Sequence, residues 1–322
     1  MNGDMHGVFK LTIRHTSSWL GLIVVTLVSG CFSEQTVMEI NRAENIRKTT
    51  DGRIFISGGQ ALFELTQGYD ESKQIEPIYQ SDDCDYFAGL AQLQGWLFFV
   101  CSQQRGFTLE GLAFRQSGRL MAYSLEQGNI QLVWNLSGYQ FANGLDAVPQ
   151  HNLILLADEN FAGKGGVSKL IIDFNNDVPQ VLEETYHWIG AAQGVYAANG
   201  LRVAGNSLFL SDLGRIKRVD LDSNWKYPQK AEKIVSRLTV FDDFDLYCGG
   251  LLVADYIGGD LLWTSLDGSQ VHKLITGLTS PSAVLSDPTP LFEEGQILFT
   301  ESVGVLPDSG HRLAMATLPI CP

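Results

Sequence analysis

The sequence predicts an all-β fold, a six-bladed β-propeller whose ring is closed by a strand from the N-terminal region. Short apolar segments recur six times along the 322-residue chain, at intervals of roughly 40–56 residues, the length of one propeller blade. Helical hydrophobic periodicity is almost absent, and Gly and Asn-Asp turns separate the segments. A single open sheet with this many strands would curl or split, whereas radial repetition protects the strand edges.

The second strand of each predicted blade is the easiest to align, because each copy is apolar and several end on an acidic residue. These segments span 53–57, 96–101, 153–158, 207–212, 251–255 and 297–301. A third strand follows each of them, at 61–65, 119–124, 168–173, 216–220, 260–264 and 312–316. Residues 34–40 alternate weakly and are predicted to complete the last blade as its outer strand. No composition shift divides the body, so we expect one domain over 43–322.

The first 30 residues have the features of a cleaved export signal. Lys10 and Arg14 precede an apolar run at 19–28, which is short for a membrane-spanning helix. The sequence Val-Ser-Gly before Cys31 resembles a bacterial lipobox, in which Cys31 would be lipidated, leaving 31–42 as tether and closing strand. Because Phe32 rather than Asp follows, we expect an outer-membrane anchor facing the periplasm, with no other membrane contact. An ordinary signal peptide with a coincidental cysteine is the alternative.

Four cysteines remain after such cleavage, and an even number in an exported chain favours disulfides. Cys84 and Cys101 flank a predicted hairpin and could face each other across it. Cys248 could tie down the C-terminal tail through Cys321. Free buried thiols are the alternative for both pairs.

The charge balance limits the partners that the chain can have. It carries 36 acidic and 22 basic residues, a formal net charge of −14, and no basic run. This composition argues against a nucleic-acid partner, and we expect a monomer. An acidic balance suits a cation site, although it is also typical of an ordinary soluble surface. No Gly-x-Ser-x-Gly motif is present, which argues against a serine hydrolase of that kind.

Six positions, each two residues before the first apolar residue of an inner strand, are predicted to converge at the mouth of the central tunnel. They are Glu44, Ala88, Asn143, Asn199, Asp242 and Ser282. Carboxylate and amide oxygens are the ligands that hard cations prefer. Glu44, Asn143, Asn199 and Asp242 are therefore candidate ligands of a divalent metal, with calcium as the first choice. The alternative is a polar ring that only hydrates the tunnel of a non-catalytic propeller.

The acids that end the second strands should lie on the same face as this mouth, because first and second strands are antiparallel. They are Asp158, Asp212, Asp255 and Glu301. Asp158 is a candidate substrate contact, although an acid at a strand end more often accepts backbone hydrogen bonds. Residues 102–118 are predicted to form a long loop at the mouth, and Arg105 within it is a second candidate substrate contact.

This layout resembles the family of senescence marker protein, gluconolactonase and luciferin-regenerating enzyme, with the paraoxonases as distant relatives. Family members bind their metal through a Glu that opens the first blade, an Asn in an Asn-Gly-Leu-Asp phrase and an Asp in a Pro-Asp-Gly phrase. Glu44, Asn199 of Asn-Gly-Leu-Arg and Asp242 of Phe-Asp-Asp-Phe match these in order. Asn143 matches a further Asn that lines the site, and the agreement covers about residues 42–302.

The resemblance implies hydrolysis of lactones or esters, with a metal that polarises the carbonyl and with Asp242 as the catalytic residue that activates water. The chain departs from the family at Phe141, where sugar-lactonases carry an arginine that holds the substrate. This departure argues against aldonolactones. A propeller that binds a small ligand or an envelope protein without catalysis is the alternative function.

Overall fold

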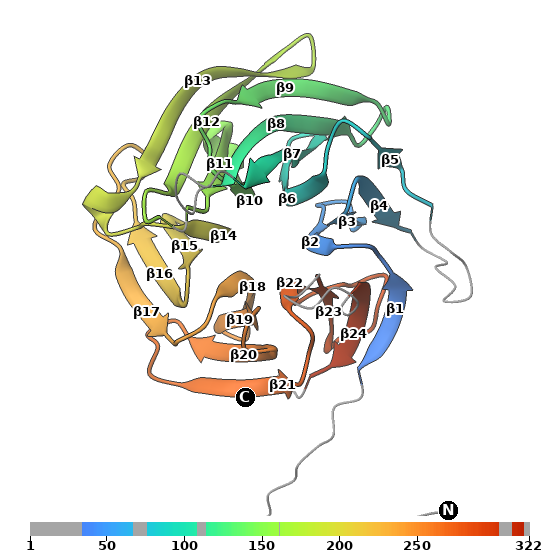
Figure 1. The fold of residues 1–322 in the computed structure, drawn as a ribbon, viewed down its shortest axis with the longest axis vertical. Coiled ribbons are helices and arrows are strands. Elements are labelled where there is room, and N and C mark those ends of the chain that lie inside the picture. The colour runs from blue at the N-terminus through green and yellow to red at the C-terminus, as the bar shows by residue number, and fades with distance from the viewer. Residues whose placement is uncertain (1–33, 67–75, 108–113, 161, 303–310, 319–322) are drawn as a thin grey trace, which may run out of the picture. The chain divides into compact units, whose positions relative to one another are not determined.

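The computed structural model describes residues 34–66, 76–107, 114–160, 162–302 and 311–318, without the side chains of 104–107 and 114–117. These residues form six four-stranded antiparallel sheets arranged around a central axis (Figure 1). The six-bladed β-propeller is therefore confirmed. Within these ranges the helical elements are two 3-10 turns, Pro149–His151 and Ala191–Gln193. None of the helices described is long and apolar enough to span a membrane.

Each blade begins with the strand nearest the axis and continues outward. The first three blades are β2 (Ala43–Lys48), β3 (Ile54–Gly58), β4 (Ala61–Leu65) and β5 (Tyr79–Gln80); β6 (Tyr86–Leu93), β7 (Trp96–Phe107), β8 (Phe114–Ser124) and β9 (Ile130–Leu136); and β10 (Ala142–Val148), β11 (Leu153–Asp158), β12 (Gly166–Asn175) and β13 (Val178–Ile189). The next two are β14 (Ala198–Ala204), β15 (Ser207–Asp212), β16 (Arg215–Asp220) and β17 (Glu232–Ser236), then β18 (Phe241–Tyr247), β19 (Gly250–Asp255), β20 (Asp260–Ser265) and β21 (Val271–Thr276).

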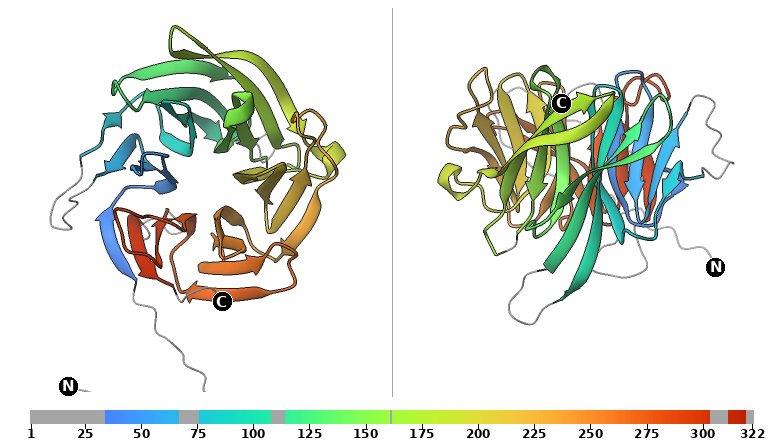
Figure 2. Two further views of the ribbon diagram at one scale, coloured as in Figure 1. Left: turned by 180° about the vertical axis from the view of Figure 1, so that it is seen from behind. Right: turned by 90° about the horizontal axis from the view of Figure 1, so that it is seen from above.

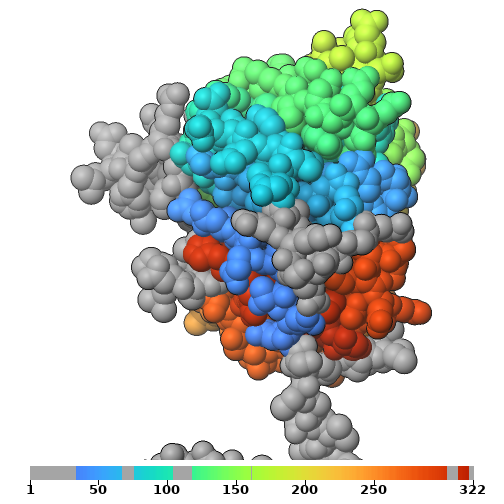
Figure 3. All heavy atoms as spheres, turned by 90° about the vertical axis from the view of Figure 1, so that its right-hand side faces the viewer, coloured from blue at the N-terminus to red at the C-terminus, as the bar shows by residue number. Residues whose placement is uncertain are grey.

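The sixth blade combines both ends of the propeller. It consists of β22 (Pro281–Leu285), β23 (Gln296–Glu301), β24 (Arg312–Thr317) and β1 (Gln35–Glu39). Strand β1 pairs antiparallel with β24, with Glu39 opposite Arg312, and the two segments lie side by side on the surface (Figure 3). The predicted closing strand is confirmed.

The apolar core is divided between the blades. Among the described residues, six clusters of buried side chains each combine two neighbouring blades. In one of them Phe55 of β3 packs with Phe87 and Phe99 of the next blade. Full burial of one such side chain contributes about 1.5–3 kcal/mol, so the faces between blades hold the ring together.

A β-bulge interrupts every inner strand close to its start. In β2, for example, Ala43 pairs with Gly58 and Asn45 pairs with Ser57, so Glu44 has no partner in the ladder. The same shift occurs in β6, β10, β14, β18 and β22. A bulge frees one residue from the ladder and redirects its side chain, which allows polar residues at these positions to face the axis.

Residues 102–118 correct one expectation. Instead of a long loop, β7 and β8 extend their pairing beyond the blade, with Ser102 opposite Gly118 and Phe107 opposite Phe114. Ser102 also pairs with Tyr86, the first residue of β6, so the extension continues past the edge at which the inner strands begin. The teal-green hairpin projects from one face of the propeller (Figure 2).

The structure contains a disulfide between Cys84 and Cys101, with an S–S distance of 2.05 Å. It links the residues before β6 to β7 and closes the pair that the sequence suggests. Cys248 is also disulfide-bonded. Cys321, which the sequence suggests as its partner, lies outside the described residues, as does Cys31.

Candidate metal and substrate site

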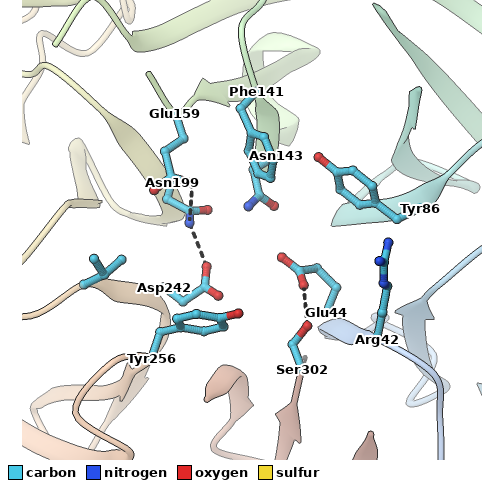
Figure 4. Close-up of a pocket in the computed structure, with 11 residues that line it drawn as sticks. Arg42, Glu44, Tyr86, Phe141, Asn143, Glu159, Asn199, Asp242, Tyr256 and Ser302 are labelled. Atoms are coloured by element: carbon cyan, nitrogen blue, oxygen red, sulfur yellow. Dashed lines mark hydrogen bonds between the residues drawn. The ribbon is translucent and has the colours of Figure 1, made fainter. Parts of the chain in front are cut away.

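The four predicted metal ligands come together around a cavity of about 330 Å³. Glu44 lies on β2, Asn143 on β10, Asn199 on β14 and Asp242 on β18, and all four point toward one another across the axis (Figure 4). Four different blades thus contribute one polar side chain each. The two remaining ring positions differ from the prediction, because neither Ala88 nor Ser282 lines this cavity.

Glycine after two of the ligands allows the inner strands to approach closely. A Cβ atom on Gly144 would lie 2.0 Å from the backbone oxygen of Asn199, and one on Gly200 would lie 2.7 Å from that of Asp242. Real Cβ atoms do not tolerate such distances, so both positions require glycine. The Asn-Gly phrases therefore set the spacing of the ring as well as supplying its amides.

Hydrogen bonds connect the carboxylates of the ring to neutral donors. Asn199 donates through Nδ2 to Asp242 Oδ1 at 2.7 Å and to Glu159 Oε2 at 3.3 Å. Ser302 Oγ donates to Glu44 Oε2 at 3.2 Å. Within the described residues no ion pair joins Glu44, Glu159 or Asp242 to a basic side chain. Arg42, which lines the same cavity, acts on Glu44 only through its charge, which lowers the pKa of that carboxyl group.

Burial raises the pKa of all three carboxyl groups, and repulsion by neighbouring carboxylates adds to it. The pKa of Glu44 rises to about 7, mainly through burial, against the opposing hydrogen bonds from Ser302 and Asn143. Burial and the charge of Glu44 raise the pKa of Glu159 to about 8. Burial, Glu44 and Glu159 together hold the pKa of Asp242 well above its ordinary value. A bound cation would offset this repulsion, because an opposite charge nearby favours the ionised form of each carboxyl group.

A wall of side chains stands above the ring, formed by residues two positions before ring positions. They are Arg42, Tyr86, Phe141 and Val240. We call these four residues the collar. The phase of the repeat that identifies the ring therefore also identifies the collar.

Six lining residues were missed at the level of sequence: Arg42, Tyr86 and Val240 of the collar, and three more that share one position in the blade. Glu159, Tyr256 and Ser302 each directly follow the acid that ends a second strand. Side chains alternate between the two faces of a strand, so the residue after a buried acid points the other way. This alternation is the signal that could have identified them.

The acids themselves support backbone segments of their own blades and do not line the cavity. Asp158 is 0% exposed and accepts hydrogen bonds from the backbone N–H groups of Gln140 and Phe141, both at 2.8 Å. His187 Nε2 contacts its other oxygen at 2.8 Å. Asp158 does not line the cavity, and it supports the segment that leads into β10.

The other three acids make comparable contacts. Asp212 accepts from the backbone N–H of Ala197 at 2.7 Å and pairs with Lys217. Glu301 accepts from the backbone N–H of Thr279 and pairs with Arg312. Asp255 accepts from the backbone N–H of Gly258 at 2.9 Å. Backbone support is therefore the common role of all four acids.

Arg105 remains a prediction. It lies on β7, in the irregular part of the ladder between Gln104 and Phe107, and its side chain is outside the described part of the structure.

The fit of the ring to a metal rests on its donors, two carboxylates and two amides. In the described ranges no three His, Cys, Asp or Glu side chains form a preassembled metal cluster, but Asn143 and Asn199 can each supply an amide oxygen.

Several solved structures share this fold. A gluconolactonase from Xanthomonas campestris superposes with a TM-score of 0.60 at 14% identity, covering 90% of this chain and 91% of its own. A calcium-binding protein, regucalcin, from Agrobacterium tumefaciens gives 0.62 at 12% identity, covering 90% and 96%. A luciferin-regenerating enzyme gives 0.61 at 12%, covering 89% and 95%. No protein-family model and no curated protein sequence matches the chain.

Proposed function

We propose that this protein is a divalent-cation-dependent hydrolase of lactones or esters, with calcium as the first candidate cation. The observation that carries the proposal is a group of three carboxyl groups, the buried Glu159 and Asp242 and the half-buried Glu44, around a cavity of about 330 Å³, with no ion pair to a basic side chain among the described residues. Buried carboxylates normally have a basic partner or a metal. The fold shared with a gluconolactonase and a calcium-binding regucalcin supports the same reading.

Glu44, Asn143, Asn199 and Asp242 would hold the cation, because together they offer carboxylate and amide oxygens from four blades. The limited charge of this set leaves room for substrate. When bound, the cation polarises the carbonyl of the substrate and stabilises the negative charge that develops on its oxygen.

The chain's own carboxyl groups would manage the protons. Asp242, ionised beside a cation, accepts a proton from the water whose oxygen bonds to the acyl carbon. The bond between that carbon and the ring or ester oxygen then breaks. Glu159, which accepts a hydrogen bond from Asn199 at 3.3 Å, stands beside the ring and in its protonated form can donate a proton to the departing oxygen. The products are a hydroxy acid from a lactone, or an acid and an alcohol from an ester.

Calcium titration calorimetry on protein stripped with a chelator tests the cation. We expect one site and a carboxylesterase or lactonase activity that chelator removes and calcium restores. Absence of binding for calcium, magnesium and manganese alike would refute the proposal. A protein that binds calcium but hydrolyses no lactone or aryl ester would instead be a ligand-binding or scaffold propeller.

We propose in addition that the protein is anchored in the bacterial outer membrane, facing the periplasm, by a lipid on Cys31. The lipobox-like sequence Val-Ser-Gly-Cys supports this location. Replacement Cys31→Ala should release the protein into the soluble fraction after export, as measured by membrane fractionation. Continued membrane partition of the variant would contradict the anchor.

A further inference from the structure

The collar is apolar around most of the cavity. The rings of Tyr86 and Phe141 stack with their centroids 5.7 Å apart and their planes at 28°, and they come from neighbouring blades (Figure 4). Val240 and Tyr256 line the cavity from the fifth blade. A substrate held by the ring would therefore have hydrocarbon and aromatic surface beside it.

Two exposed apolar residues stand next to lining residues in the sequence. Leu238, two residues before Val240, and Ile257, directly after Tyr256, are both exposed, Ile257 by 64%. The two segments that carry Val240 and Tyr256 are thus apolar beyond the cavity lining as well.

Two of the four collar positions carry no hydrogen-bonding group on the side chain. Among the cavity-lining residues Arg42 is the one with a cationic side chain. A polyhydroxylated ligand needs a hydrogen-bond partner for each hydroxyl that it buries. The collar offers Phe141 and Val240 at two of its four positions, which cannot supply such partners.

We propose that the substrate is a small lactone or ester that carries an apolar substituent, an alkyl chain or an aromatic ring, and that this substituent packs against the Tyr86–Phe141 pair. This inference rests on the proposed function, because it places the substrate carbonyl at the ring. A cavity of about 330 Å³ lies at the lower end of the range for ligand sites, so the substituent is short.

A series of γ-lactones with side chains from methyl to hexyl tests the wall, assayed at saturating calcium. Each methylene that becomes buried should raise kcat/KM about fourfold until the cavity is filled. Phe141→Ala should lower kcat/KM for the longest accepted lactone by about tenfold or more relative to its effect on unsubstituted γ-butyrolactone. Phe141→Leu should restore most of the loss, because leucine keeps apolar surface in the same place.

Leu182→Ala is the matched control. Leu182 is 72% exposed on the outer strand β13, so the variant loses a comparable apolar side chain away from the cavity and should behave as wild type. A kcat/KM that does not rise with chain length, or that is higher for gluconolactone than for the alkyl lactones, would overturn the inference while leaving the hydrolase intact.

Binding of the matching alkyl γ-lactams separates the two proposals, because the amide carbonyl is retained but resists hydrolysis. Isothermal titration should show tighter binding with longer side chains in wild type and a flat series in Phe141→Ala. Tightening without hydrolysis of any lactone would refute the hydrolase and keep the apolar ligand. A flat series in wild type would overturn the apolar ligand whatever the activity.

Discussion

Two layers of buried charge lie along the inner strands, and they are treated in opposite ways. In the ring at the mouth, the carboxyl groups of Glu44 and Asp242 have no basic partner among the described residues. A second layer lies on the same four inner strands, three residues after each of the proposed metal ligands. It is formed by Arg47, Asp146, Arg202 and Asp245. In this layer acids and bases alternate and neutralise one another.

The second layer is a compact network. Arg47 Nη2 contacts Asp146 Oδ1 at 2.6 Å, and Asp146 Oδ2 accepts the backbone N–H of Val203 at 2.7 Å. Arg202 Nη2 contacts Asp243 Oδ2 at 2.9 Å and Arg202 Nε lies 3.5 Å from Asp245. The network therefore carries its own counter-charges.

The pKa values reflect the difference between the layers. Burial alone would lower the pKa of Arg202, but the charges of Asp243 and Asp245 raise it above its ordinary value. Burial raises the pKa of Asp243, with Arg202 opposing, whereas no such opposing cation lies among the causes at Asp242. In one layer each carboxyl group lies beside an arginine, whereas in the other no ion pair to a basic side chain is present among the described residues.

Asp242→Asn should have the largest effect. It removes a charge from the ring at the mouth, so cation affinity should fall by more than about 100-fold and activity with it. Calcium calorimetry and lactone hydrolysis measure both. Asp245→Asn, on the same strand β18 but in the second layer, is the control and should keep cation binding. Equal losses in the two variants would show that the layers do not differ in function.

Arg202→Met should mainly affect stability. It leaves Asp243 buried without its cation, and removal of one partner of a buried pair costs about 3–5 kcal/mol. Urea unfolding should show this loss, while the folded variant keeps its affinity for calcium. The double variant Arg202→Met/Asp243→Asn should recover part of the loss, since it removes the stranded charge. A loss below about 1 kcal/mol in the single variant would mean that the network is not what stabilises this layer.

The effect of pH on the stability of the folded state should be smaller, and it should reverse in direction when the cation is bound. Glu44 and Glu159 have folded pKa values of about 7 and about 8, above the ordinary 4.5 for Glu44. Without cation, the folded state therefore gains stability from these groups below pH 4.5 and loses it as the pH rises toward 8. Cation affinity should rise over the same range, because the ligands ionise. Thermal unfolding at pH 5.5 and pH 8, with calcium and with chelator, measures both trends, and a flat Tm in chelator would contradict the raised pKa values.

The sequence repeat was sufficient for the fold and for the phase of the ring. Glu44, Asn143, Asn199 and Asp242 could be placed because each stands at the same offset from an inner strand, and alignment of the blades converts that offset into position around the axis. Ala88 and Ser282 share the offset but not the role. Ser282 Oγ instead donates a hydrogen bond to the backbone oxygen of Ala43 at 2.8 Å and forms a second hydrogen bond with Thr300 Oγ1.

The features that the sequence did not indicate depend on contacts between residues far apart in the chain. Glu159 follows an acid that itself looked functional, and only the backbone bonds of Asp158 show which of the two adjacent carboxyl groups faces the cavity. The charge pair between Arg202 and Asp243 joins two blades at a sequence separation of 41, which no local pattern indicates. The extension of β7 and β8 was missed because polar residues in 102–118 are as typical of a loop as of a projecting hairpin.

The pairing of β1 with β24 also has a consequence for the order of folding. Arg312 contacts Thr36 across 276 residues of sequence, so the ring closes through one of the most distant contacts that the chain can make. Such contacts form slowly, because the intervening chain loses entropy before the contact is gained. During synthesis or export, β1 emerges first and has no partner until the last blade is complete. A circular permutant that joins β1 directly to β24 would make this contact local, and its refolding rate in stopped-flow fluorescence should exceed that of the natural order.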